Sequence, residues 1–213
     1  MSLTQELGPI RTVAILRGMA PGKAVDLAQR SWEAGIDLVE VPVQDHRSWL
    51  ALEAVMAAAD GRPVGAGTVT TLQRAERAIG LGVAVCISPG LHPAVVELAR
   101  ALGAPVLPGV LTPTEAQAAS DLGVTTCKLF PAGLLGAGYL NALRPVFPGL
   151  AFVPTGAVDA GNTAALVDAG ASAIAFGGAL ERVLDEPSAI REAARIKRPW
   201  IIAPLPQLSE TLQ

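Results

Sequence analysis

The stretch from Leu122 to Phe130 reads LGVTTCKLF, in which a leucine and a glycine precede an apolar run that one lysine interrupts. The glycine fits the left-handed residue that ends a helix, and the run after it fits a strand buried on both faces. The same junction recurs at Ala34-Gly35, Leu81-Gly82, Leu102-Gly103 and Ala169-Gly170. The chain therefore repeats a helix end followed by a buried strand.

The spacing of these junctions indicates one repeating unit. The glycines at 35, 82, 103, 123 and 170 are 47, 21, 20 and 47 residues apart. These gaps are multiples of a unit of about 20–24 residues, which is enough for one strand, one helix and two tight loops. Two unmarked units are therefore expected at residues 44–66 and 130–154.

Signals for the starts of helices agree with the positions of these repeating units. Pro21 opens a helix whose apolar side has helical spacing. Thr112 to Glu115, TPTE, combines an N-cap, a proline at the first helical position and a glutamate, which predicts a capping box. The stretch from Thr70 to Gln73, TTLQ, predicts a second one.

Eight strands alternating with eight helices are expected. The strands are Val13–Leu16, Leu38–Val43, Val64–Ala66, Ala84–Ile87, Val106–Leu107, Thr125–Phe130, Ala151–Val153 and Ala173–Phe176. This pattern allows a closed (β/α)₈ TIM barrel or a doubly wound sheet. The even repeat, and the polar residues or glycines that follow almost every strand, favour the barrel, whose mouth carries the active site in enzymes of that fold. A solenoid shares the short period but lacks this loop chemistry.

The predicted organisation is a single α/β domain over residues 1–198, followed by a proline-containing tail over residues 199–213 that either docks along the barrel or stays mobile. The 51% of hydrophobic and 16% of charged residues exclude intrinsic disorder. A net charge of −3 provides no basic field for nucleic acid.

The mean hydropathy of +0.43 raises the possibility of a membrane span. The longest charge-free apolar stretch, Ala78 to Val96, has the length of one, but glycines and prolines interrupt it. The first residues lack the basic start and apolar run of a signal peptide. No membrane partner and a cytoplasmic location are therefore expected.

The two cysteines, Cys86 and Cys127, each lie in an apolar run and are expected to be small buried hydrophobic residues. Only His46 and His92 occur besides them, so no zinc-type cluster can be assembled from the sequence, and no metal is expected.

Lys128 is the lysine that the apolar pattern singles out. The other two lysines, Lys23 and Lys197, fall in helical, solvated contexts. In a buried strand an unpaired ammonium is costly, so the neutral amine is favoured, and a neutral amine attacks carbonyl groups to form a Schiff base. The structural alternative is a lysine that pairs with a core carboxylate or reaches solvent from a strand edge.

Glu40 is the only charge in a second apolar strand, Leu38–Val43. Alternate strands fill one layer of a barrel, so Glu40 on the second strand and Lys128 on the sixth can share a layer if both point inward. Glu40 would then move protons through a water or hydroxyl, and such acid–base help is worth about 10²–10⁴ in rate. A buried salt bridge of little net stability is the alternative.

Arg17 ends the first strand, where a guanidinium suits a carboxylate or phosphate; a surface ion pair is the alternative. Thr68 places a hydroxyl close to the backbone after the third strand. Gly156, Gly177 and Gly178 expose backbone N–H groups where many barrels hold phosphate, although turn geometry alone explains any one of them.

Together these segments resemble the 2-keto-3-deoxy-6-phosphogluconate / 4-hydroxy-2-oxoglutarate aldolase family, from about residue 9 to residue 184. The matching stretches, in family order and spacing, are Ala14-Ile15-Leu16-Arg17, Val39-Glu40-Val41, Gly65-Ala66-Gly67-Thr68-Val69, Ile87-Ser88-Pro89, Pro108-Gly109, Lys128-Leu129-Phe130-Pro131 and Pro154-Thr155-Gly156.

The resemblance implies a class I aldolase without metal or other cofactor, usually a homotrimer. In it, Lys128 matches the Schiff-base lysine and Glu40 the general acid/base. The positions that match pocket residues around the pyruvate moiety are Thr68, Pro89, Phe130 and Thr155. Those that match the phosphate region at the far end are Gly156, Gly177 and Gly178.

The sequence departs from the family pattern at three places. Gln44 stands where some members carry an arginine, and it is similar to the asparagine of the 6-phosphogalactonate branch; Arg17 resembles the guanidinium that other members use. Ala157 and Ala179 replace a glycine and a serine near the phosphate region, so an unphosphorylated 2-keto acid is an open alternative.

The resemblance therefore implies reversible cleavage of 2-keto-3-deoxy-6-phosphogluconate, or of its galactonate epimer, to pyruvate and glyceraldehyde 3-phosphate. A 4-hydroxy-2-oxoglutarate aldolase is one alternative. A sugar-phosphate isomerase or epimerase, in which Lys128 only polarises a carbonyl, is another. A catalytically silent relative that binds a metabolite or a partner chain is the third.

Overall fold

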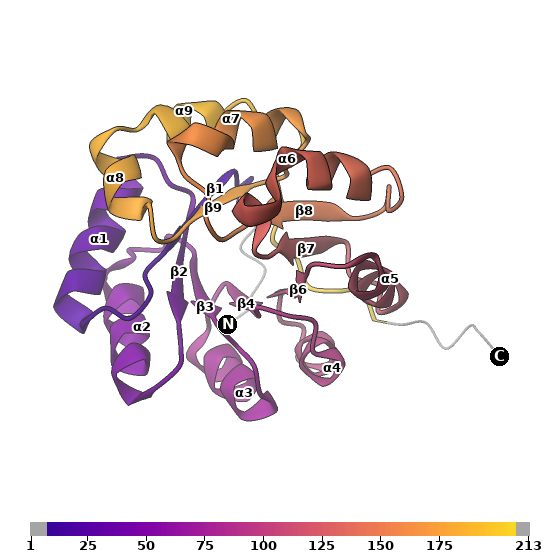
Figure 1. The fold of residues 1–213 in the computed structure, drawn as a ribbon. Coiled ribbons are helices and arrows are strands. Elements are labelled where there is room, and N and C mark those ends of the chain that lie inside the picture. Colours follow the sequence, from indigo (N-terminus) through magenta and orange to yellow (C-terminus); the bar gives the residue numbers. More distant parts are fainter. Residues whose placement is uncertain (1–7, 208–213) are drawn as a thin grey trace.

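The units predicted from the glycine junctions form strands followed by helices in the computed structural model, which describes residues 8–207 (Figure 1). In that range the strands are β1 (Thr12–Ile15), β2 (Leu38–Pro42), β3 (Val64–Gly67), β4 (Val85–Ile87), β5 (Val106–Leu107), β6 (Gly109–Val110), β7 (Thr126–Leu129), β8 (Ala151–Pro154) and β9 (Ile174–Phe176). The helices are α1 (Pro21–Glu33), α2 (His46–Ala58), α3 (Leu72–Leu81), α4 (Pro93–Ala101), α5 (Pro113–Asp121), α6 (Ala132–Leu143), α7 (Ala160–Asp168), α8 (Leu180–Asp185) and α9 (Ser188–Ala193).

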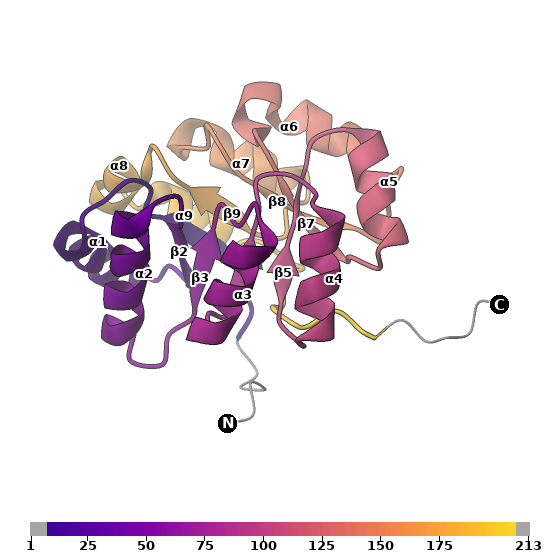
Figure 2. The ribbon, with the colours of Figure 1, turned by 90° about the horizontal axis from the view of Figure 1, so that it is seen from below.

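The strands pair in parallel in two ladders. One ladder has the order β5-β4-β3-β2-β1-β9 and the other the order β6-β7-β8. Only Pro108 separates β5 from β6, and an isolated parallel bridge joins Thr155, directly after β8, to Ala175 of β9. The fold is therefore a curled parallel sheet with the helices outside it, as Figures 1 and 2 show.

The structure has β6 in addition to the eight predicted strands. Leu107 of β5 pairs with Ile87, whereas Gly109 of β6 pairs with Lys128, so the two short strands belong to different ladders. The break falls at Pro108, which has no N–H to donate to a ladder. The Pro108 carbonyl still accepts a hydrogen bond from the Lys128 amide at 2.9 Å.

Each of the eight predicted strands is found with its ends within one residue of the prediction. The five junction glycines all have positive φ, from 63° to 86°, which confirms the predicted left-handed helix ends. The capping box of Thr112 and Glu115 is confirmed. The second predicted box is wrong, because α3 begins one residue later: Thr71 is the N-cap, and its hydroxyl accepts from the amide of Arg74.

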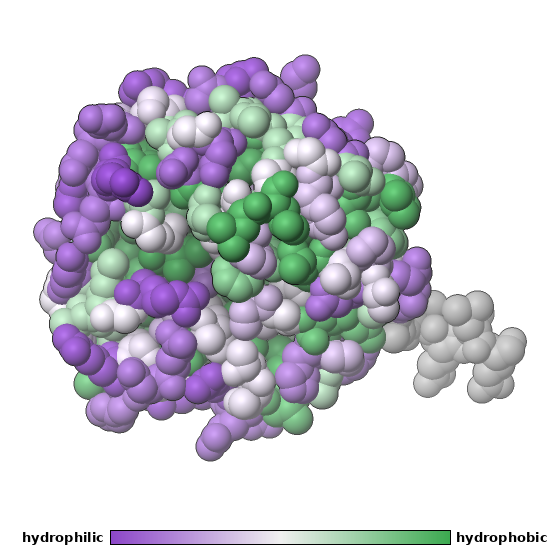
Figure 3. Space-filling model, viewed as in Figure 1, coloured by the Kyte–Doolittle hydropathy of each residue, from purple (hydrophilic) through white to green (hydrophobic). Residues whose placement is uncertain are grey.

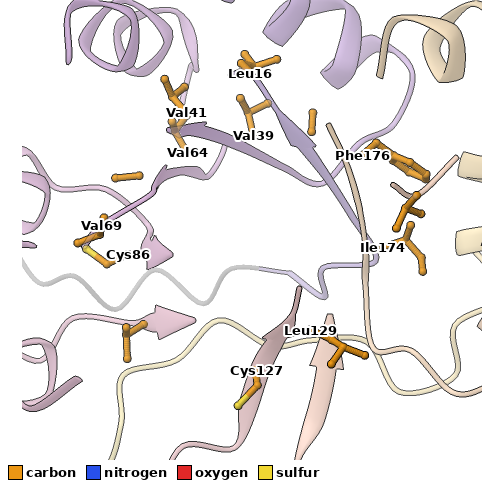
Figure 4. Close-up of a cluster of buried hydrophobic side chains, with 14 of the residues drawn as sticks. Leu16, Val39, Val41, Val64, Val69, Cys86, Cys127, Leu129, Ile174 and Phe176 are labelled. Atoms are coloured by element: carbon orange, nitrogen blue, oxygen red, sulfur yellow. The ribbon is translucent and has the colours of Figure 1, made fainter. Parts of the chain in front are cut away.

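Side chains alternate between the two faces of the sheet. Val13, Ile15 and Leu38 belong to an inner cluster of buried residues, whereas Leu16 and Val39 belong to the larger cluster between the sheet and the helices. Figure 4 shows ten labelled members of this outer cluster, which lie on the strands or just after them. The core is thus double, with a small inner layer and a large outer one.

The chain segment after α9 closes the end of the sheet at which the strands begin. Ile10 and Trp200 exchange two backbone hydrogen bonds, of 2.8 and 3.1 Å. Trp200 and Ile202 are buried in the inner cluster, and Arg100 donates to the carbonyl of Pro206 at 3.1 Å. The predicted tail therefore packs on the body through residue 207; its last six residues, and residues 1–7 of the predicted barrel, lie outside the described range.

Cys86 and Cys127 are free and buried, as predicted. Between residues 8 and 207, no helix has both the length and the apolar character that a membrane crossing requires. Figure 3 shows apolar side chains gathered over α6 on the face in view, and Leu134 and Leu135 of this helix are 74% and 46% exposed.

Candidate active site

A cavity of about 410 Å³ opens where β1, β7, β8 and β9 end. It is lined by Ile15, Arg17, Met19, Lys128, Phe130, Thr155, Gly156, Gly177, Gly178, Leu180, Glu181 and Arg182. Seven of these residues were predicted from the sequence. The carboxyl ends of the strands are where enzymes with parallel barrels place their active sites, so this cavity is the candidate site.

Lys128 and Glu40 meet inside the curled sheet, where the side-chain alternation places them. Glu40 lies two residues after Leu38 of the inner cluster, and Lys128 lies between Cys127 and Leu129 of the outer one. Both are buried, at 4% and 1% exposed, and the Lys128 Nζ lies 3.4 Å from Oε1 and 3.5 Å from Oε2 of Glu40.

This buried ion pair is looser than ion pairs on the surface of the same protein. Lys23 and Glu181 approach to 2.8 Å while both are more than half exposed. A buried pair offsets the cost of removing two charges from water only when its geometry is very good. The long contact therefore argues against a purely structural salt bridge and leaves the amine accessible from the cavity that it lines.

Gly67 makes the room in which the Glu40 carboxylate lies. A Cβ built on this residue would be 2.1 Å from Oε1 of Glu40, closer than any real contact. Gly67 is in register with Pro42 on the neighbouring strand, so its missing side chain opens space beside β2. This role of Gly67 was not predicted from the sequence; the available signal was the two glycines of VGAG, next to a strand with one glutamate.

Arg17 and Gln44 lie at the ends of the neighbouring strands β1 and β2. Arg17 is exposed, and its Nη1 donates to Oε1 of Gln44 at 3.2 Å. Arg74 of α3 in turn donates to the Gln44 carbonyl at 3.0 Å and to the hydroxyl of Thr70 at 2.6 Å. The Arg17 guanidinium is therefore held on the β2 side of the mouth and makes no ion pair with a carboxylate in the described part of the chain.

Phe130, Thr155 and Gly156 follow β7 and β8 and line the cavity, and their predicted contact with a substrate stays a prediction. The Lys128 Nζ lies 5.8 Å from the centre of the Phe130 ring, within the range of a cation–π contact. The Thr155 hydroxyl donates to the Val153 carbonyl at 3.1 Å.

Thr68 and Pro89 do not line this cavity, and their predicted contact with a substrate stays a prediction. Thr68 has a φ of +57°, which is strained for a β-branched residue and is often found at functional sites. The Pro89 carbonyl lies against Gly109, where a Cβ would approach it to 2.2 Å, and Gly109 is in register with Lys128.

The cavity also contains side chains that the sequence analysis missed. These are Ile15, Met19, Leu180, Glu181 and Arg182. Glu181 and Arg182 follow the predicted glycines of the last strand by three to five residues, and this closeness was the only available signal. Within residues 8–207 no three His, Cys, Asp or Glu side chains gather as a metal site requires.

The chain is similar to known proteins in sequence and in structure. The family model for "KDPG and KHG aldolase" matches residues 4–192. A "probable 2-dehydro-3-deoxy-6-phosphogalactonate aldolase" of Rhizobium meliloti (strain 1021) is 37% identical over 170 residues, 79% of this chain and 80% of that protein. The 2-dehydro-3-deoxy-6-phosphogalactonate aldolase of Escherichia coli (strain K12) is 33% identical over 172 residues, 80% of this chain and 84% of that protein.

Solved structures give the same result. The one described as "Native KDPGal structure" superposes with a TM-score of 0.78 at 30% sequence identity, covering 86% of this chain and 94% of that one. The likeness therefore extends over most of the fold and is not confined to the strands around the cavity.

Proposed function

The chain belongs to the KDPG and KHG aldolase family, and on that premise we propose that it is a class I aldolase in which Lys128 forms a Schiff base with a 2-keto acid. The substrate is a 2-keto-3-deoxy-6-phosphohexonate, the gluconate or its galactonate epimer, and the products are pyruvate and glyceraldehyde 3-phosphate. The observation that carries the proposal is the buried Lys128 amine, which lines the cavity with the Glu40 carboxylate 3.4 Å away.

The first step forms the covalent intermediate. The neutral Lys128 amine attacks C2 of the keto acid to give a carbinolamine, which loses water to become an imine. Glu40 is close enough to take a proton from Nζ before the attack and to return one to the leaving hydroxyl, directly or through a water.

The second step breaks the C3–C4 bond. The protonated imine accepts the electron pair of that bond as an enamine, while Glu40, through water, removes the proton of the C4 hydroxyl so that C4 leaves as an aldehyde. Protonation of the enamine at C3 gives the imine of pyruvate, and its hydrolysis frees Lys128. Arg17 binds the carboxylate of the keto acid, and the backbone N–H groups of Gly156, Gly177 and Gly178 face the other end of the substrate.

Borohydride trapping tests this assignment. Pyruvate and sodium borohydride together should leave one reduced adduct on Lys128, located by mass spectrometry of the digested protein. Lys23 and Lys197 serve as controls within the same chain, because both are exposed. An unmodified Lys128, or an adduct on either control lysine, would contradict the assignment.

A sugar-phosphate isomerase or epimerase is the alternative reaction. It would use Glu40 to abstract a proton and Lys128 only to polarise a carbonyl. Lys128→Arg separates the two, since arginine keeps the charge but forms no Schiff base. We expect this variant to catalyse no aldol cleavage. Residual isomerisation or epimerisation of a sugar phosphate by the variant would support the alternative. Turnover of any keto-deoxy acid in a coupled pyruvate assay would exclude a catalytically silent relative.

The same assay tests the substrate. We expect the 6-phosphorylated acids to be cleaved with a higher kcat/KM than 4-hydroxy-2-oxoglutarate or an unphosphorylated keto-deoxy acid. A higher kcat/KM for the unphosphorylated acids would assign the enzyme to them. Ala157 and Ala179 leave this alternative open.

Three further expectations belong to this proposal. The curled sheet is a closed (β/α)₈ barrel, supported by the single residue between β5 and β6 and by the Thr155–Ala175 bridge. The enzyme is a homotrimer, for which exposed Leu134 and Leu135 would provide apolar surface to bury; light scattering measures the mass. The cytoplasmic location stays a prediction.

A further inference from the structure

The end of the cavity formed by β8, β9 and α8 has few side chains that can donate hydrogen bonds. Ala157 and Ala179 carry none, and the Thr155 hydroxyl is engaged with the Val153 carbonyl at 3.1 Å. Arg182 of α8 is the strongest donor that lines this end. Recognition of an anion here therefore depends on backbone amides and on this guanidinium.

Arg182 has no competing partner in the described part of the chain: its guanidinium makes no hydrogen bond or ion pair there. Its neighbour Glu181, also in the cavity wall, is bound to Lys23 at 2.8 Å, and this contact lowers the pKa of the Glu181 carboxyl. The negative charge of Glu181 is thus compensated from α1, and the charge of Arg182 remains available to a ligand.

The second guanidinium of the cavity is directed elsewhere. Arg17 donates to Gln44 at the end of β2, whereas Arg182 comes from the helix that follows β9. A substrate with an anionic group at each end is bound more strongly when a cation faces each group. An exposed arginine is ordinarily only a solvated surface charge, and what distinguishes Arg182 is that it lines the same cavity as Lys128.

We propose that Arg182 binds the phosphate at the end of the substrate far from the keto group and makes the enzyme prefer phosphorylated substrates. This inference rests on the proposed function. A guanidinium can offer a phosphate two parallel N–H donors, which a hydroxyl cannot do. Arg182 would thereby supply the hydrogen bonds that Ala157 and Ala179 do not.

The test compares substrates in one variant. Arg182→Gln should lower kcat/KM for the 6-phosphorylated acid about 10- to 100-fold, the size expected for one lost charge-assisted contact. For the unphosphorylated acid, the kcat/KM of this variant should differ from that of wild type by less than about threefold. Arg191→Gln, which changes an exposed arginine outside the cavity lining, is the matched control and should leave both values unchanged. Arg182→Lys should recover part of the preference.

Equal losses for both substrates, or no loss for either, would overturn the proposal. Binding of inorganic phosphate, followed by ³¹P line broadening, gives a readout that needs no turnover: Arg182→Gln should weaken it and Arg191→Gln should not. Borohydride trapping of pyruvate distinguishes a failure of the proposed function from a failure of the role of Arg182. If wild type forms no adduct, the proposed function fails; if both proteins form it while phosphate preference and phosphate binding are unchanged, only the role of Arg182 fails.

Discussion

A methyl group on Gly67 would lie 2.1 Å from Oε1 and 2.8 Å from Cδ of Glu40. The carboxylate is buried on β2 and fills the space that this glycine leaves on β3, so its position depends on a missing side chain as much as on the charge of Lys128. A group that moves protons must be held within a fraction of an ångström of its productive position.

Gly67→Ala should therefore impair catalysis more than folding. The methyl group forces the carboxylate away from its place beside Lys128, and a displacement of about 1 Å costs about 100-fold in kcat. Gly80→Ala is the control, because a Cβ there meets nothing within 4 Å. The checks are kcat and the urea midpoint of both variants; a Gly67→Ala enzyme with wild-type kcat would show that the Glu40 position is not critical.

The Lys128–Glu40 pair should limit stability while it serves catalysis. Lys128→Met alone or Glu40→Leu alone leaves a buried charge without its partner and should cost about 3–5 kcal/mol of unfolding free energy. The double variant replaces the pair by apolar groups and should be as stable as wild type, or more so, although inactive. Urea unfolding of wild type, the two single variants and the double variant measures these free energies. A double variant clearly less stable than wild type would instead indicate that the pair stabilises the fold, and losses that simply add would indicate that the two side chains do not interact.

Much of the fold could be predicted because its signals are local. Gly123 ends a helix and the apolar residues after it form a strand within a few positions, so the ends of the eight strands followed from neighbouring residues alone. The start of α3 was missed by one residue because Thr70 and Thr71 can both cap a helix. Which of the two caps the helix depends on the path of the loop after β3, and the sequence does not show that path.

The site could be predicted only in part, because the sequence carries local signals and does not show which distant segments meet. Lys128 and Glu40 stand out as single charges in apolar strands, and strand alternation brings them to the same face. The hydrogen bond from Arg17 to Gln44 joins segments that are far apart in the chain. Arg182 likewise lines the cavity together with residues from distant segments. Their polar residue types are common at surfaces, so the only signal in the sequence was the closeness of Arg182 to Gly177 and Gly178.

The capping box of α5 should make stability depend on pH. The Glu115 carboxylate accepts hydrogen bonds from the amides of Thr112 and Leu111, both at 2.8 Å, and these bonds lower its pKa below the ordinary 4.5. A group whose pKa is lower in the folded state adds stability above its unfolded pKa, and this stability disappears as the pH falls through the folded value.

Glu115→Gln keeps the shape of the cap and removes the charge. We expect it to cost about 0.3–1 kcal/mol near neutral pH, and the difference from wild type should shrink as the pH falls below 4.5. Urea unfolding of both proteins at several pH values measures this. A difference that stays constant with pH would show that the carboxylate charge contributes nothing.

The two thiols should be inert in the folded protein. Burial raises the pKa of Cys86 and of Cys127 to about 12, and the thiolate is the reactive form. With 5,5′-dithiobis(2-nitrobenzoate) at about pH 8, native protein should react far more slowly than protein in urea, which should release two equivalents at once. Rapid reaction of either thiol in the native state would mean that the outer cluster opens readily.

Trp200 should stabilise the fold without contributing to catalysis. It is 5% exposed and pairs with Ile10, and its amide also donates to Ser172 at 2.9 Å, at the end of the sheet where β1 and β9 begin. The cavity lies at the opposite end, where the strands finish. Trp200→Ala should therefore cost about 3–5 kcal/mol of unfolding free energy, while kcat of the folded fraction stays close to wild type. Ile201→Ala is the matched control, because the neighbouring Ile201 is 57% exposed and its truncation should cost less than about 0.5 kcal/mol. A Trp200→Ala protein with full stability, or a folded one with a reduced kcat, would contradict this separation between the two ends of the sheet.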